Sequence, residues 1–367
     1  MNIFAAALSA ALLILILCGA SLDTRSGRLK DESFDRGSGA ALRGALATIV
    51  VVHHLSQRAD FGVFTELCKN VGYLAVAVFF CLSGYGLMKR HTSTDGYAKG
   101  FLKKRLGTVL VPYILTGFLY IAAGYLLGAP YTPRAIADSF VKGDPFIQFS
   151  WYIIVIVYFY IVFYLLMRVC KRRYKTIAAL AFAACVLHII LCRSLHYGAW
   201  WYNAVFAFPI GMVWALNEKR TAKAVRRRYA AVLLPSLLLF AAGAAGRQWG
   251  YAHAGETAHS TDIITLSSML ASAFFVTSLA LIMMKVRLGN KALTFLGGIS
   301  LEMYLTQGLF IVLLREHISN DIIYCGVSIA GTIVTAFLLS KAVSLMKKAL
   351  PKGHSDKNIK RKEAING

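Results

Sequence analysis

The chain is poor in charged residues, and above all in acidic ones. Of its 367 residues 16% are charged, 17 Asp and Glu stand against 40 Lys and Arg, and hydrophobic residues reach 57%. Soluble globular domains are about a quarter charged and about half apolar. The shortage of charge excludes a soluble enzyme, a disordered protein and a secreted disulfide scaffold, and it indicates an integral membrane protein.

Several motifs that are typical of soluble enzymes are also missing. The sequence has no P-loop, no G-x-G-x-x-G and no G-x-S-x-G. Its seven cysteines form no C-x-x-C pair, and no Cys/His spacing is typical of a zinc site. Most of the cysteines lie in apolar runs, so we expect buried free thiols and no bound metal.

What the chain does have is a series of apolar runs of membrane-spanning length. They predict an all-α fold, a polytopic transmembrane helix bundle with ten core helices and an extra N-terminal helix. The eleven predicted spans are 3–20, 42–56, 72–89, 107–128, 150–169, 175–193, 199–216, 229–246, 263–285, 295–315 and 322–346.

The basic residues of the connecting loops alternate along the chain. The loops that begin at 21, 90, 170, 217 and 286, and the tail after 346, are rich in Lys and Arg, whereas the loops between them are poor. Because Lys and Arg favour the cytoplasmic side, we expect a multi-pass protein of the cell membrane with its C-terminus inside. This topology accounts for the net charge of +23, so we expect membrane lipid and no nucleic acid as a partner.

The same pattern divides the chain into three parts. Residues 1–37 form an N-terminal hydrophobic segment and a cytoplasmic linker. Residues 38–346 form the membrane domain. Residues 347–367 form a basic cytoplasmic tail, polar enough that we expect it to be disordered.

Arg43 and His54 are the first candidates for chemistry, because titratable groups within a membrane span are costly and often functional. They are eleven residues apart, about three turns, so they share one helix face about 16 Å apart along the axis, while His53 points elsewhere. Arg43 at the cytoplasmic end and His54 deeper in could hold an anionic cofactor and a general base. A structural hydrogen bond for His54 and an interfacial position for Arg43 would explain the pattern equally.

A basic cluster, Lys103, Lys104 and Arg105, precedes the third core helix on the cytoplasmic side. Such a cluster could pair with the phosphates of coenzyme A. Topology determination and the binding of anionic lipid are the alternatives.

Aromatic residues mark the outer ends of two spans, Trp151 and Tyr152 in one and Trp200–Tyr202 in the other. They indicate either an interfacial aromatic belt or a platform on which sugars stack. In the span 295–315, Ser300, Tyr304 and Gln307 are spaced as a polar stripe that faces the bundle interior.

Taken together, the order and spacing of these residues resemble acyltransferase family 3 of bacterial integral membrane proteins, over residues 38–346. The resemblance is carried by five motifs. They are Arg43 with ten residues between it and His54, Phe79–Tyr85, Phe101–Arg105 ahead of Pro112, Ser150–Tyr152 ahead of Tyr160 and Phe163, and Gly298–Ser300 followed by Tyr304 and Leu305.

The resemblance implies ten core helices and a membrane O-acyltransferase. Such an enzyme moves an acetyl group from cytoplasmic acetyl-CoA to a hydroxyl of a cell-surface or lipid-linked carbohydrate. Carried over by position, His54 is the catalytic histidine and Arg43 its partner, which would orient the cofactor or stabilise developing charge. Lys103, Lys104 and Arg105 match the family's basic cluster.

For the acceptor we expect contacts from Trp151, Tyr152 and Tyr304. Many family members have a histidine near the position of Gln307, so the amide found there is given no catalytic role. Two lysines in the basic cluster also lack the bidentate geometry of arginine.

Two other functions fit a polytopic chain. A transporter or flippase for a lipid-linked sugar would predict internal repeats, which the sequence does not show. A structural partner in an envelope complex would leave the spacing of Arg43 and His54 unexplained.

Overall fold

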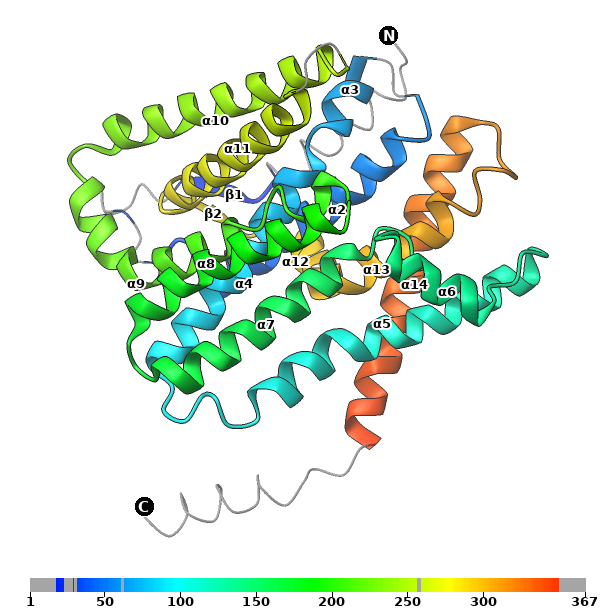
Figure 1. Ribbon diagram of the computed structural model, residues 1–367, viewed down its shortest axis with the longest axis horizontal. Helices are drawn as coiled ribbons and strands as arrows, with labels where there is room; N and C mark the ends of the chain where they lie inside the picture. Colours follow the sequence, from blue (N-terminus) through cyan, green and yellow to red (C-terminus); the bar gives the residue numbers. More distant parts are fainter. Residues whose placement is uncertain (1–17, 23–28, 30–31, 61–62, 256–258, 350–367) are drawn as a thin grey trace.

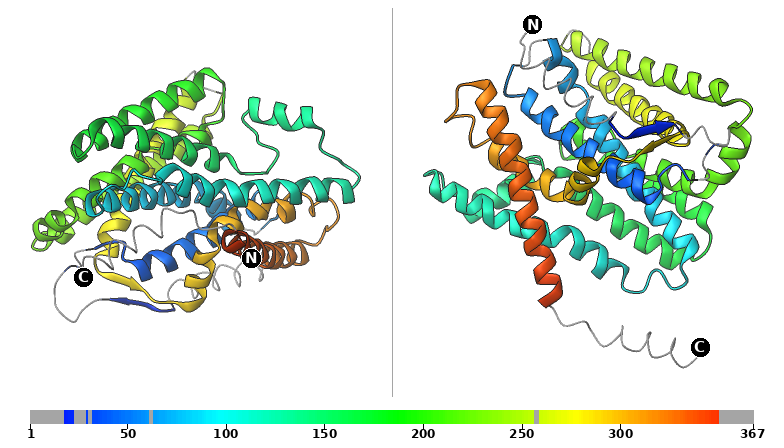
Figure 2. Two further views of the ribbon diagram at one scale, coloured as in Figure 1. Left: turned by 90° about the horizontal axis from the view of Figure 1, so that it is seen from below. Right: turned by 180° about the vertical axis from the view of Figure 1, so that it is seen from behind.

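A computed structural model of the chain describes residues 18–22, 29, 32–60, 63–255 and 259–349, and they form a helix bundle (Figure 1). The predicted span 3–20 lies outside these residues, apart from its last three. Ala20 already belongs to a strand, because β1 (Ala20–Leu22) pairs antiparallel with β2 (Val286–Leu288). The two strands lie beside one another in Figure 2.

The predicted all-α membrane bundle is confirmed. Within the described residues, eight helices are long and apolar enough to cross a membrane. They are α2 (Arg36–Ser56), α4 (Gly72–Ser93, in a span that starts at Leu67), α5 (Phe101–Leu126), α7 (Trp151–Cys170), α8 (Tyr174–Ser194), α10 (Tyr229–Ala252), α11 (Ser260–Met283) and α14 (Asp321–Ala349). Two short helices, α3 (Val63–Lys69) and α6 (Pro133–Val141), lie in loops.

The two remaining spans differ from their predicted form. The span 199–216 is shifted, because α9 (Ala207–Val225) starts later and includes lysines of the predicted loop that begins at 217. Trp200 and Trp201 lie instead in a 3₁₀ turn, η1 (Ala199–Trp201). The buried indole of Trp201 stabilises this turn by donating a hydrogen bond to the carbonyl of Gly143 at 2.9 Å. The hydrophobic periodicity of the sequence does not predict such a tertiary contact.

The span 295–315 is not one helix but two, α12 (Lys291–Gly298) and α13 (Ser300–Ile311), joined at Ile299. Two adjacent glycines at the end of α12 weaken the helix there. Gly297 also packs directly on α2, where a side chain would collide with the carbonyl of Ala40. The break therefore lets α12 lie against the helix that carries Arg43 and His54.

Several contacts connect segments that the sequence predicts on the same side of the membrane. Ser33 N–H bonds to Glu218 at 2.6 Å, and Arg172 pairs with Asp95. At the opposite end Arg193 pairs with Asp262 at 2.7 Å. We name the end with the basic loops (94–100, 171–173 and 284–290) the inner end, and the end with loops 57–71, 127–150 and 195–206 the outer end.

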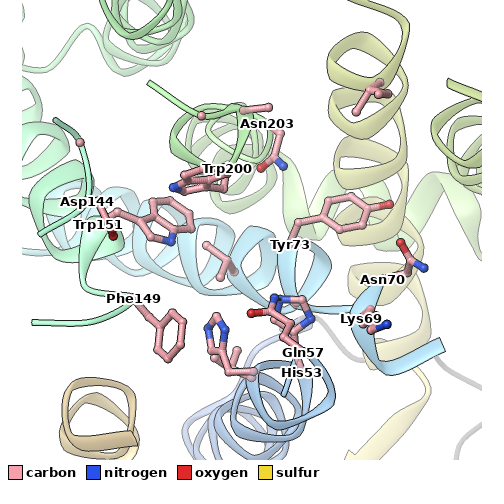
Figure 3. A pocket seen from close by; sticks show the side chains of 18 of the residues that line it. His53, Gln57, Lys69, Asn70, Tyr73, Asp144, Phe149, Trp151, Trp200 and Asn203 are labelled. Carbon is pink, nitrogen blue, oxygen red and sulfur yellow. The ribbon is translucent and has the colours of Figure 1, made fainter. Parts of the chain in front are cut away.

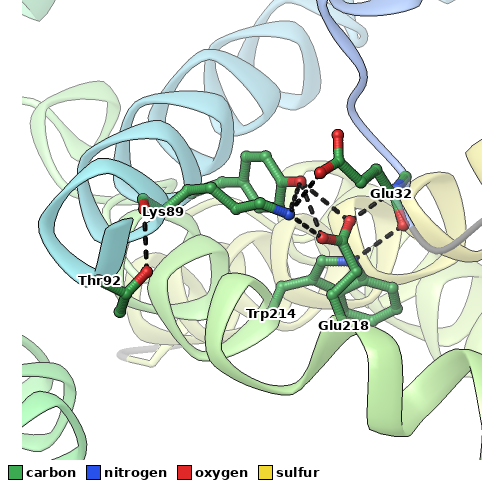
Figure 4. Close-up of polar contacts among 7 residues, drawn as sticks. Glu32, Lys89, Thr92, Trp214 and Glu218 are labelled. Atoms are coloured by element: carbon green, nitrogen blue, oxygen red, sulfur yellow. Dashed lines mark hydrogen bonds and ion pairs between the residues drawn. The ribbon is translucent and has the colours of Figure 1, made fainter. Parts of the chain in front are cut away.

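At the inner end a buried carboxylate fixes the segment before α2 (Figure 4). Glu218, 2% exposed, accepts hydrogen bonds from Ser33 N, from the Tyr85 hydroxyl at 2.9 Å and from Lys89 Nζ at 2.7 Å. The Trp214 indole donates to the Ser33 hydroxyl at 3.0 Å. Two residues further on, Asp35 caps α2, so this cluster sets where the helix begins.

Candidate functional site

A cavity of about 1080 Å³ opens at the outer end of the bundle (Figure 3). It lies between the last turns of α2 and α10 and the first turns of α4 and α7, with loop 195–206 completing the wall. In Figure 3 Phe149 and Trp151 face Tyr73, Asn70 and Lys69 across the cavity. Its volume is at the upper end of the range for small-molecule sites.

His54 lies in the wall of this cavity, near the end of α2. Its ring stacks on Phe149, with 3.7 Å between the ring centroids and 14° between the planes. The Nδ1 atom of His54 is buried and makes no hydrogen bond within the described part of the chain. A buried polar atom without a partner is uncommon in native proteins, so this nitrogen requires a reason.

Phe149 is held against His54 by its backbone. Its φ of 67° places it in the left-handed region, which costs a residue with a side chain about 1–2 kcal/mol. The Tyr304 hydroxyl donates a hydrogen bond to the Phe149 carbonyl. Strained residues of this kind cluster at functional sites.

The neighbouring His53 also lines the cavity, so the prediction that it points elsewhere is wrong. At the open end of α2 the cavity is wide enough to reach both side chains. His53 differs in its bonds: Nδ1 is 3.0 Å from the carbonyl of Cys68, and Nε2 is 3.1 Å from the amide nitrogen of Gln57. Because a carbonyl only accepts, Nδ1 carries the proton, and Nε2 accepts from Gln57. His53 is therefore fully bonded.

Arg43 lies eleven residues earlier on α2, near its inner end, and does not line the cavity. It is half-buried, and its guanidinium makes no hydrogen bond or ion pair with any residue in the described ranges. The structure therefore keeps Arg43 and His54 on one helix without bringing them into one site.

The basic cluster borders a second cavity of about 400 Å³ at the inner end, between the end of α4 and the start of α5. Lys104 and Arg105 line it, whereas the adjacent Lys103 does not. Arg90 and Lys99 complete a set of four cations there. These two had no predicted role, although both belong to the same basic loop.

Arg105 is fixed by two aromatic residues. Its Nη2 donates to the Tyr97 hydroxyl at 3.1 Å, and its guanidinium carbon is 5.9 Å from the centre of the Tyr160 ring.

Two tyrosines of α7 lie between the inner and the outer end. Tyr152 precedes Tyr160 by eight residues, which is about 12 Å along the helix axis. The hydroxyl of Ser83 on α4 is a polar neighbour of both phenols.

Of the three aromatic residues expected to contact the acceptor, two line the outer cavity and one does not. Trp151 and Tyr304 line the outer cavity, but Tyr152 does not. The Tyr152 ring packs beneath it, 4.8 Å from Phe80 and 5.6 Å from Tyr304 between ring centroids.

The outer cavity also includes residues that the sequence did not single out. Trp200, 53% exposed, and Asn203, whose buried Oδ1 has no partner among the described residues, lie in one wall. Arg247 also lines the cavity and is hydrogen-bonded to Asn70. Its only signal in the sequence was that it is the one basic residue of its outer loop.

A family model described as an acyltransferase domain, Acyl_transf_3, matches residues 40–341, which is most of the chain. No curated protein and no solved structure matches the chain.

Proposed function

The chain belongs to acyltransferase family 3, and from this premise we propose that it moves an acetyl group from cytoplasmic acetyl-CoA to a hydroxyl of a cell-surface or lipid-linked carbohydrate. His54 is the general base in this proposal, and the acceptor binds in the outer cavity. The reaction takes place in the cell membrane, with the C-terminus on the cytoplasmic side.

The observation that carries the proposal is the unpartnered nitrogen of His54, among the described residues, in the wall of a large cavity. A neutral imidazole has one N–H and one lone pair, and no protein group in the described ranges occupies Nδ1. Histidine is also the side chain whose ordinary pKa suits proton transfer near neutral pH. His53, with both nitrogens bonded, is unsuited to the task.

The reaction transfers an acyl group from the sulfur of a thioester to the oxygen of a hydroxyl. The acceptor hydroxyl gives its proton to His54 while its oxygen bonds to the acetyl carbonyl carbon. The carbon–sulfur bond of the thioester then breaks, and the coenzyme A thiolate leaves and takes up the proton. The Phe149 ring fixes the imidazole plane through its stacking contact.

The donor binds at the inner end in this proposal. Arg90, Lys99, Lys104 and Arg105 surround a cavity with one carboxylate, Asp95, which is already paired with Arg172. Four cations suit the phosphates of coenzyme A. Arg43, near the inner end of α2 and without a protein partner in the described part, orients the donor, and it lies too far from His54 to contact the reacting carbonyl.

The thioester has to reach from the inner cavity to the outer one. A column of hydroxyls lies in that direction: Tyr160 next to Arg105, Ser83, Tyr152, and Tyr304 in the outer wall. We assign this column to the passage of the acetyl-bearing arm. Tyr152 therefore contacts the donor side rather than the acceptor.

The wall of the outer cavity supports a carbohydrate acceptor. Trp151, Trp200 and Tyr304 present aromatic rings, and the buried Oδ1 of Asn203 lacks a partner within the described residues. Aromatic faces pack on the apolar C–H faces of sugars, while amide oxygens accept hydrogen bonds from sugar hydroxyls.

The test uses inverted membrane vesicles supplied with acetyl-CoA labelled in the acetyl group and with glycans from the same cells. We expect label in lipid-linked or polymeric glycan from the wild type, and none above empty vesicles from His54→Ala at equal expression. His53→Ala is the matched control and retains transfer. Equal label from wild type and His54→Ala would contradict the role of His54. No label from the wild type would contradict the activity itself.

A further inference from the structure

Arg247 is held in the wall of the outer cavity by aromatic and amide side chains. It lies near the outer end of α10, with its guanidinium carbon 4.7 Å from the ring centres of both Tyr73 and Tyr251. One Nη atom donates to the Asn70 side chain, and the other lies 3.5 Å from the Tyr251 hydroxyl. The side chain is therefore pre-oriented by neutral groups.

The charge of Arg247 is not balanced by a carboxylate of the described residues. No carboxylate in the described ranges forms an ion pair with it, and its buried Nε has no hydrogen-bond partner there. Two other arginines at the outer end are paired: Arg193 with Asp262 at 2.7 Å and Arg315 with Asp321 at 2.6 Å. Neither of these two lines the cavity. Among the described residues, Arg247 is the arginine that lines the cavity, and it has no carboxylate partner there.

The surrounding cavity has an excess of positive charge. Lys69 and Lys142 line it together with Arg247, whereas Asp144 is its one carboxylate among the described residues. Arg247 also lies near enough to His53 for the two to interact electrostatically, so this charge is close to the histidine pair. A cleft lined by one sign of charge concentrates ligands of the opposite sign.

We propose that the acceptor carries an anionic group, a phosphate or a carboxylate, and that Arg247 binds it in the outer cavity. This inference rests on the proposed function and names the acceptor class. Guanidinium binds carboxylate and phosphate through two parallel N–H bonds, and Nε with its neighbouring Nη forms one such edge. The anionic group can belong to the glycan or to the lipid phosphate that bears it.

Binding of simple probes tests the proposal without requiring acetyl transfer. The full-length protein in nanodiscs of phosphatidylcholine is titrated with glucose, glucose 1-phosphate and glucuronate, and quenching of tryptophan fluorescence is followed. We expect both anionic sugars to bind the wild type at least tenfold more tightly than glucose. Added salt should weaken that preference.

Two variants of Arg247 and one control locate the site. Arg247→Gln removes the preference, and Arg247→Lys retains only part of it, because lysine keeps the charge and loses the fork. Arg193→Gln retains the full preference, since this arginine is paired outside the cavity. Size-exclusion profiles and melting temperatures establish that the three variants are folded.

The two sources of the anion are separated by adding phosphatidylglycerol to the nanodiscs. Competition with glucose 1-phosphate in the wild type, lost in Arg247→Gln, assigns the site to a lipid phosphate. No competition assigns it to the anionic group of the glycan. Equal binding of glucose and its anionic forms by the wild type would overturn the proposal, and so would an unchanged preference in a folded Arg247→Gln. Because these are binding measurements, failure of acetyl transfer would be seen separately.

Discussion

The two ends of the bundle hold polar clusters of opposite character. At the inner end the carboxylate of Glu218 is buried and accepts hydrogen bonds from Ser33, Tyr85 and Lys89. At the outer end His54 has a buried nitrogen with no partner in the described part of the protein. Both clusters lie next to α2, one before its first turn and one in its last.

This difference in hydrogen bonding distinguishes buried polar groups that stabilise the fold from buried polar groups that are available to a ligand. A buried group whose hydrogen bonds are all made contributes to stability, whereas an unpaired one costs about 1–3 kcal/mol. Among the described residues, three such groups lie around one cavity, on His54, Asn203 and Arg247. We interpret the Glu218 cluster as a clamp on the chain before α2, and the outer cavity as a site completed by its ligand.

The largest effect is expected at the outer cluster. His54→Gln removes the lone pair that acts as base and should lower kcat about 10²–10⁴-fold. The melting temperature should fall less than in Glu218→Gln, because the stacking contact with Phe149 is lost but no protein hydrogen bond to Nδ1 is lost among the described residues. Initial rates of acetyl transfer and thermal melting of the same preparation measure both. A large fall in melting temperature would show that His54 is structural.

The opposite result is expected at the inner cluster. Glu218→Gln should destabilise the protein by about 1–3 kcal/mol, because the hydrogen bonds of a buried carboxylate are weakened. Lys89 retains Glu32 at 3.1 Å, which limits the loss. Unfolding in denaturant measures the effect, and the specific activity of the folded protein should stay within about twofold of wild type. Lost activity at unchanged stability would contradict the clamp.

A smaller effect, on the KM for acetyl-CoA, should distinguish two residues of the basic cluster, Arg105 and Lys103. Arg105→Gln should raise the KM for acetyl-CoA about tenfold, the value of one charge-assisted hydrogen bond. Lys103→Gln should change it by less than about twofold, because Lys103 lies outside the inner cavity. Steady-state kinetics with varied acetyl-CoA measure both. Equal effects would indicate that net charge, and not the cavity, binds the donor.

The smallest effect is expected from loss of the hydrogen bond that holds the backbone of Phe149. Tyr304→Phe removes the hydrogen bond to the Phe149 carbonyl, worth about 0.5–1.5 kcal/mol. Phe149 should then stack less firmly on His54, so kcat should fall severalfold while the KM for the acceptor stays unchanged. A raised acceptor KM with an unchanged kcat would instead show that the Tyr304 hydroxyl hydrogen-bonds the acceptor directly.

Much of this fold is predictable because it depends on local properties of the sequence. Apolar length alone identifies eight spans, and the spacing of Arg43 and His54 places both on α2. The break at Ile299 is less accessible, because it also depends on how closely α12 packs on α2. A single span of apolar residues is compatible with one helix or two.

The site was predictable only in part, for a related reason. Lys103 and Lys104 are alike in sequence, and only the position of the loop after α4 makes one of them line the inner cavity. Arg247 meets Asn70 across 177 residues of chain. Contacts of this kind arise when helices pack, and no local pattern in the sequence indicates them.

The central claim is that donor and acceptor enter from opposite ends and meet near His54. It is tested most directly in proteoliposomes of uniform orientation, with labelled acetyl-CoA on one side and a glycan acceptor on the other. We predict labelled acceptor only when acetyl-CoA faces the inner end and the acceptor faces the outer end. Transfer that requires both substrates on the same side would contradict the account.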